Sequence, residues 1–159
     1  MDVKEEEYLK ILAELTRQNS SKLNSYIEHF EIKAQKSYGI SVKDLRAIAR
    51  GISRNHELAI KLWDSGIREA RILASMIDDP KQVTPEQMEK WASDFDSWDI
   101  CDECCINLFI KTPFAYEKAI EWSNSDKEFV KRAGFVLMAN LAMHDKISAK
   151  TNLQCLLSA

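Results

Sequence analysis

Apolar residues recur along the chain with the 3.6-residue period of amphipathic helices. In residues 4–18 they stand three and four positions apart, at Tyr8, Leu9, Ile11, Leu12 and Leu15. Residues 22–33, 126–143 and 148–158 show similar helical patterns. No window combines a period of two with the β-branched enrichment of a strand. The pattern predicts an all-α chain.

Capping residues set the expected limits of the other helices. Ser41 and Asn55 suit the N-caps of helices that end near Arg50 and Gly66, and glycine favours the position after a helix. A helix over 67–77 stops before Pro80. Later N-caps are expected at Thr84-Pro85, at Asp96 or Ser97 for a helix to about 110, and at Thr112-Pro113 for a helix to 122.

The predicted helices recur as pairs. A helix, a short turn and a second helix occupy 59–74, then 87–110, then 119–135, with a step of roughly 30–40 residues. Pairs of this kind stack into a curved solenoid whose second helices line one concave face. Arg71, Asp102 and Arg132 each fall in the second helix of a successive pair. In a regular stack these three side chains face one groove.

Composition narrows the class of protein. With 159 residues, 45% of them hydrophobic and 30% charged, the chain suits one soluble domain with a sizeable core. A net charge of −3 argues against a uniformly basic nucleic-acid-binding surface. A local basic groove remains possible, because cations gather late in the chain, at Lys127, Lys131, Arg132, Lys146 and Lys150.

The N-terminal residues and the apolar runs bear on location. The first ten residues are acidic and amphipathic and lack the apolar core of a secretory signal. The longest apolar runs, such as 135–138, are far shorter than a membrane span. We therefore expect a cytoplasmic protein with no membrane contact and with reduced cysteines.

Residues 95–109 hold three of the four cysteines. Cys101, Cys104, Cys105 and Leu108 cover one helical arc of about 100°, which favours buried core thiols. A zinc site is the first alternative, but Cys155 is remote and no histidine completes the ligand set. A redox CxxC pair is the second alternative, but that motif normally lies in a βαβ unit, and the sequence predicts no strand. We expect no metal site and no cofactor.

Trp98 and Asp102 stand four residues apart and so share one side of a helix. One interpretation is a rim carboxylate that pairs with Arg132 or Arg71 on a neighbouring helix. The other is an aromatic platform beside a carboxylate, which suits a cationic ligand or a reaction that develops positive charge. The spacing alone leaves both interpretations open.

Four segments resemble one known family. They are YGISVKDLRAIAR (38–50), SGIREARILASMIDDP (65–80), FDSWDICDECCINLF (95–109) and KEFVKRAGFVLMANLA (127–142). In this order they resemble the DNA alkylation repair family, the AlkD-like DNA glycosylases built from HEAT-like repeats. The resemblance implies a right-handed α-α superhelix with a concave groove, formed by residues 1–159 as a single domain. That domain is short at its C-terminus, because the chain has no counterpart of the family's C-terminal tryptophan segment.

The family resemblance also implies an activity. Its members excise N3- and N7-alkylated purines from double-stranded DNA without a cofactor. By this resemblance Trp98 contacts the lesion, Asp102 stabilises the oxocarbenium-like sugar and positions water, and Arg132 holds the adjacent phosphate. Further candidate phosphate contacts, which are otherwise ordinary helix-surface charges, are Lys131, Arg71, Arg46 and Lys43.

Two other functions remain open at this point. A DNA-binding homologue without catalysis would use the same basic groove. A protein-interaction scaffold is a common use of helical solenoids. The terminal Leu153, Leu156 and Leu157 are expected to form an apolar end through which the chain forms a homodimer.

Overall fold

The computed structural model describes the backbone of residues 3–18 and 37–157, and side chains within 5–18 and 37–145. All regular elements in these residues are helical, which confirms the predicted all-α class. The elements are α1 (Val3–Arg17), α3 (Val42–Ala49), α4 (His56–Asp64), α5 (Arg68–Ile77), α6 (Pro85–Ser93), α7 (Trp98–Asn107), the 3₁₀ turn η1 (Phe109–Lys111), α8 (Ala115–Ser123) and α9 (Glu128–Leu157). The helix predicted over 22–33 and the side chains of the terminal leucines lie outside the described residues.

Three of the predicted N-caps are confirmed. The side chains of Ser41, Asn55 and Thr84 each accept a hydrogen bond from the backbone N–H three residues later, at 3.1 Å. Each bond satisfies a donor that the first helical turn leaves without an intrahelical partner. Gly66 follows α4 with φ of +70°, as expected for a glycine after a helix end.

The N-cap predicted at Thr112 is wrong. Helix α8 begins at Ala115 with Phe114 in the cap position. The Thr112 hydroxyl instead donates to the carbonyl of Phe109 at 2.7 Å and closes the turn η1. A threonine hydroxyl can hydrogen-bond either as an N-cap or within a turn, and at Thr112 it does so within the turn.

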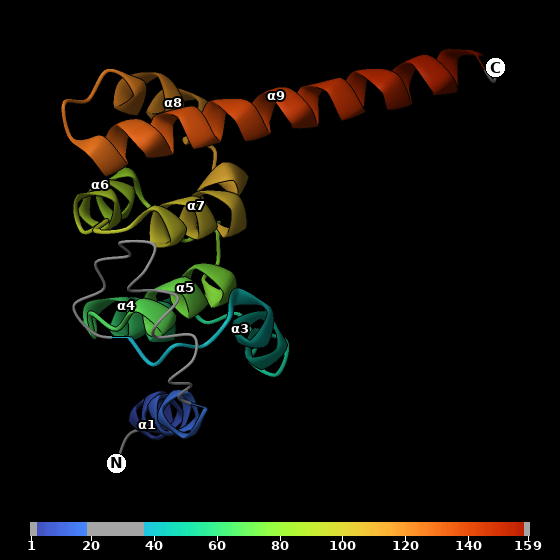
Figure 1. Ribbon diagram of the computed structural model, residues 1–159. Coiled ribbons are helices and arrows are strands. Elements are labelled where there is room, and N and C mark those ends of the chain that lie inside the picture. Colours follow the sequence, from blue (N-terminus) through green and yellow to red (C-terminus); the bar gives the residue numbers. More distant parts are fainter. Residues whose placement is uncertain (1–2, 19–36, 158–159) are drawn as a thin grey trace.

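The break predicted between 143 and 148 is also wrong. Helix α9 runs without interruption from Glu128 to Leu157. The residues at the expected break contain neither glycine nor proline, so nothing in the backbone ends the helix there. Figure 1 shows the second half of α9 extending past the body of the stack.

The helix pairs α4/α5, α6/α7 and α8/α9 are stacked in successive layers, with α3 beside α5 and α1 near α4 (Figure 1). Helix α5 packs on α7, and α7 packs on α9, so the second helices form a row. No helix in the described part of the chain has both the length and the apolar character needed to cross a membrane.

Aromatic side chains fill the core between the layers. The rings of Trp63 and Trp91 stack at 4.0 Å with an angle of 3° between their planes. Phe109 continues the contact to Trp122, with ring centroids 5.7 Å apart. Asp94 accepts from the Trp63 indole at 2.9 Å, so this buried donor is satisfied. These three tryptophans hold the layers together.

A backbone contact fixes the last pair. A Cβ added to Gly134 of α9 would overlap the backbone nitrogen of Ser123, at the end of α8. Only glycine permits the two helices to approach this closely, so α8 holds the first turns of α9 tightly against the stack.

A buried polar network fixes the start of α7. The Nε of Arg68 donates to Asp99 at 2.6 Å, and NH1 donates to Glu69 at 2.9 Å. Glu69 also accepts from the backbone N–H groups of residues 38–40. All three charged side chains are buried. Because a buried charge is costly unless it is paired, this network determines how α7 sits on α5.

Candidate nucleic-acid interface

One side of α7 is open to solvent. Trp98, Asp102 and Ile106 stand four residues apart along the helix, and we call these three side chains the open face. Trp98 is 39% exposed and Ile106 is 42% exposed. Large apolar side chains left partly exposed on one side of a helix are a feature of binding surfaces.

The cysteines lie on the other side of α7. Cys101, Cys104 and Cys105 are buried against neighbouring helices, which confirms the prediction of core thiols. Burial raises the pKa of Cys104 and of Cys105 well above the ordinary thiol value. In the described residues no group of three or more His, Cys, Asp or Glu side chains is arranged to hold a metal ion.

Asp102 pairs with Arg132 of α9. The Nε and NH2 groups of Arg132 donate to the two oxygens of the Asp102 carboxylate, each at 2.7 Å. This hydrogen-bonded carboxylate raises the pKa of Arg132. The guanidinium carbon lies 6.0 Å from the centroid of the Trp98 ring. The fold therefore brings Trp98, Asp102 and Arg132 together, although Arg132 is 30 residues from Asp102.

A second arginine–carboxylate pair borders the open face on its other side. Arg46 of α3 donates to Glu103 at 3.1 Å. Asn107, one turn further along α7, also donates to Glu103 at 3.0 Å. On a helical projection Asp102 and Glu103 lie about 40° and 140° from Trp98, with Ile106 between them. Arginines from α3 and α9 therefore flank the open face.

Glu103, Asn107 and Ile106 were not among the residues predicted from the sequence. Arg46 and Glu103 are 57 positions apart, and no local spacing links them. Ile106 belongs to the apolar pattern of α7, and its exposure follows from the packing of α5 and α9 on either side. Only the three-dimensional arrangement identifies these residues.

The remaining predicted phosphate contacts lie in different surroundings. Lys131 on α9 and Lys43 on α3 are exposed, and neither forms a hydrogen bond or an ion pair within the described side chains. Arg71 is half-buried and makes no hydrogen bond to Asp102 or Arg132. Its guanidinium donates to the carbonyls of Trp63 at 3.3 Å and Asp94 at 3.2 Å. These bonds place Arg71 at the junction of two helix pairs.

Comparison with known proteins decides the family. A family model described as DNA alkylation repair enzyme matches residues 11–158. The chain belongs to the DNA alkylation repair enzyme family. The match confirms the resemblance inferred from the four sequence segments. It extends from the second half of α1 to the end of α9.

Curated relatives of this family member occur in Listeria. An uncharacterized protein of Listeria monocytogenes is 32% identical over 101 residues, which are 62% of this chain and 45% of the relative. An uncharacterized protein of Listeria innocua is 31% identical over 101 residues, with the same coverage. The matched region thus spans less than half the length of these relatives.

A solved structure shares the fold. It is described as "A new family of proteins related to the HEAT-like repeat DNA glycosylases with affinity for branched DNA structures". The TM-score is 0.74 at 21% identity, over 82% of this chain and 55% of the other. At this identity the similarity shows the fold, and it confirms the predicted HEAT-like repeats.

Proposed function

We propose that this family member binds double-stranded DNA across the open face and hydrolyses the N-glycosidic bond of N3- or N7-alkylated purines. One observation carries the proposal: the Asp102 carboxylate lies beside the exposed Trp98 and is fixed at both oxygens by Arg132. A carboxylate held in place next to an aromatic face suits a reaction in which positive charge develops on the sugar.

The chemistry needs little more than this carboxylate. An N3- or N7-alkylated purine carries a positive charge, so it leaves as a neutral base when the C1′–N9 bond breaks, and it needs no general acid. Positive charge passes to the sugar, and the oxygen of water then bonds to C1′ and loses a proton. Asp102 stabilises the charged sugar and orients the water, while the Trp98 ring favours the cationic base.

Arg132 leaves room for this role. A carboxylate has about four acceptor positions on its two oxygens, and Arg132 occupies two of them at Asp102. Water can therefore bind to Asp102 while the pair stays intact. The guanidinium has further N–H donors, which suit a phosphate next to the lesion.

The test is a single-turnover assay on a duplex with one 7-methylguanine. The native chain should release the base above the spontaneous rate, and Asp102→Asn should lower that release on the order of 100-fold. Glu117→Gln, at an exposed carboxylate of α8, is the matched control and should leave the rate unchanged. Base release that is equal in Asp102→Asn and native chain would contradict the proposed role.

A second candidate is DNA binding without catalysis. It is favoured by the structural neighbour, whose description names affinity for branched DNA structures. This candidate predicts that the chain binds a four-way junction, releases no methylated base, and binds equally well after Asp102→Asn. Release of base by the native chain would exclude it.

A further inference from the structure

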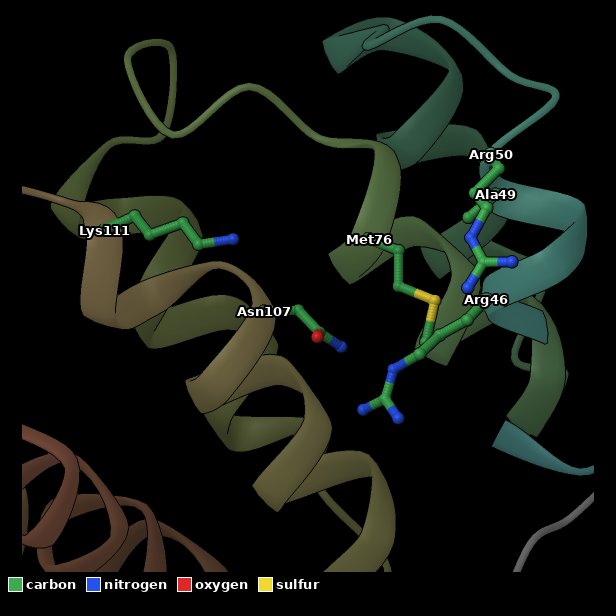
Figure 2. A pocket seen from close by; sticks show the side chains of 6 residues that line it. All are labelled: Arg46, Ala49, Arg50, Met76, Asn107 and Lys111. Atoms are coloured by element: carbon green, nitrogen blue, oxygen red, sulfur yellow. The ribbon is translucent and has the colours of Figure 1, made fainter. Parts of the chain in front are cut away.

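A basic cavity lies beside the open face, between α3, α5 and the end of α7. Its volume is about 320 Å³, and it is lined by Arg46, Ala49, Arg50, Met76, Asn107 and Lys111. Figure 2 shows Lys111 reaching into it from one side and Arg46 from the other. The cavity therefore collects residues from three helices and η1 that are far apart in the sequence.

Positive charge dominates the cavity. Arg50 and Lys111 have no ion-pair partner within the side chains that the structure describes. Glu103 engages the NH2 group of Arg46, and the guanidinium has other donors. Loss of water around its ammonium group, followed by nearby Arg54, lowers the pKa of Lys111. Three cations near one carboxylate leave a local surplus of positive charge on a chain whose net charge is −3.

Hydrogen bonds hold two polar groups of the cavity in place, those of Arg46 and Asn107. Glu103 accepts from both Arg46 and Asn107, and Asn107 also donates to Ser75 at 3.2 Å. Met76 and Ala49 contribute an apolar part of the wall. A site rich in N–H donors, with arginine forks and an apolar wall, suits a compact anion with several oxygens.

We propose that this cavity binds one phosphate group. The inference rests on the proposed DNA binding for the source of that phosphate, which is the DNA backbone beside the open face. Arg50 and Lys111 neutralise the phosphate, and Arg46 contacts it from the side of α7. The cavity borders α7 on the flank opposite Arg132, so the two sites together fix DNA across the open face.

The test compares two double variants that remove the same charge. Arg50→Gln/Lys111→Gln removes two cations from the cavity. Arg17→Gln/Lys90→Gln removes two cations from exposed ion pairs on α1 and α6. Affinity for duplex DNA is measured by fluorescence anisotropy at several salt concentrations. The cavity variant should lose roughly tenfold in affinity, and the slope of log affinity against log salt should fall by about one. The control should match the native chain.

Thermal unfolding accompanies the comparison. The cavity variant should melt no lower than the native chain, because Lys111→Gln removes a positive charge that lies near Arg54. A cavity variant that keeps the native melting temperature, affinity for DNA and salt slope would show that the cavity does not contact the DNA backbone, whether or not the glycosylase proposal holds.

A second arm uses inorganic phosphate alone and follows the side-chain amide of Asn107 by ¹H–¹⁵N NMR. A shift of this signal in the native chain, absent in the cavity variant, supports the site even if DNA fails to bind, in which case the proposed function is the one that fails. DNA binding that depends on the cavity, without a free-phosphate shift, assigns the site to the DNA backbone. If the cavity variant keeps the native affinity for DNA and phosphate causes no shift of the Asn107 signal, the cavity is not a phosphate site.

Discussion

Two arginine–carboxylate pairs connect successive second helices and differ in burial. Arg68 and Asp99 are buried, with 5% of each residue exposed. Asp102 and Arg132 use the same chemistry at the surface, where 44% of the Arg132 side chain is exposed. Removing one partner of a buried pair leaves an unpaired buried charge and destabilises the fold, whereas an exposed pair contributes little to stability. The exposed pair is the one that we propose for binding and catalysis.

This contrast gives a prediction for two matched substitutions. Asp99→Asn should lower the free energy of unfolding by about 3 kcal/mol, because it leaves the Arg68 charge buried with fewer partners. Asp102→Asn should lower it by less than about 1 kcal/mol. Urea unfolding followed by circular dichroism measures both. Equal losses in the two variants would show that burial does not distinguish the pairs.

Single residues were predicted from the sequence where a local spacing exists. Trp98 and Asp102 stand four positions apart, so their common side of α7 follows from helical geometry. The pairing of Arg46 with Glu103 joins distant repeats, and no spacing encodes it. Arg71 occupies the same place in its repeat as Arg132, yet the carbonyls of Trp63 and Asp94 bind its guanidinium. Equivalent sequence positions thus have different partners.

At the scale of the element, α7 has two sides with different roles. Its buried side carries the thiols, and burial raises the pKa of Cys104 and Cys105. A thiol reacts as its thiolate, so both groups should be inert in the folded chain.

The prediction concerns alkylation by iodoacetamide at about pH 8, which lies below the raised thiol pKa values. Cys104 and Cys105 should remain unmodified in the native chain, as should Cys101 because its side chain is buried, and all three should react fully in guanidinium. Mass spectrometry of the peptides separates them from Cys155. Rapid native modification of Cys104 or Cys105 would show that α7 is not packed as described.

The α8–α9 contact gives a second prediction at this scale. Gly134→Ala should destabilise the chain by about 2 kcal/mol, since the new methyl group overlaps the backbone of α8 and the helices must separate. Gly51→Ala is the control: its added Cβ would be 3.4 Å from the nearest atom, an ordinary contact. Thermal unfolding should show a lower melting temperature for Gly134→Ala alone. No drop would contradict the close approach of α8 and α9.

Three helix starts were predicted from their capping side chains, whereas the continuity of α9 was not predicted. Ser41, Asn55 and Thr84 indicate a helix start, because each side chain accepts a hydrogen bond from a backbone N–H that has no intrahelical partner. The continuity of α9 could not be predicted from its apolar pattern, because the pattern fades where the helix leaves the stack. A helix with no breaker continues even where it has little to pack against.

At the scale of the whole molecule, the row formed by α3, α5, α7 and α9 determines which side chains meet. The aromatic column of the core buries Trp63, Trp91 and Trp122, and Trp98 alone among the four tryptophans is exposed. The open face has Arg132 on one flank and the basic cavity on the other, and this is the surface that we propose for DNA binding. This surface forms only when the repeats stack, because its residues come from different repeats.

The indole signals of the four tryptophans in a ¹H–¹⁵N NMR spectrum test this surface most directly. A duplex DNA is titrated into the labelled chain, and Trp98→Phe assigns the signal of Trp98. The Trp98 signal should shift or broaden on DNA binding, while those of Trp63, Trp91 and Trp122 stay in place because their rings are buried. DNA binding that leaves the Trp98 signal unchanged, or no binding at submillimolar DNA and low salt, would contradict DNA recognition by the open face.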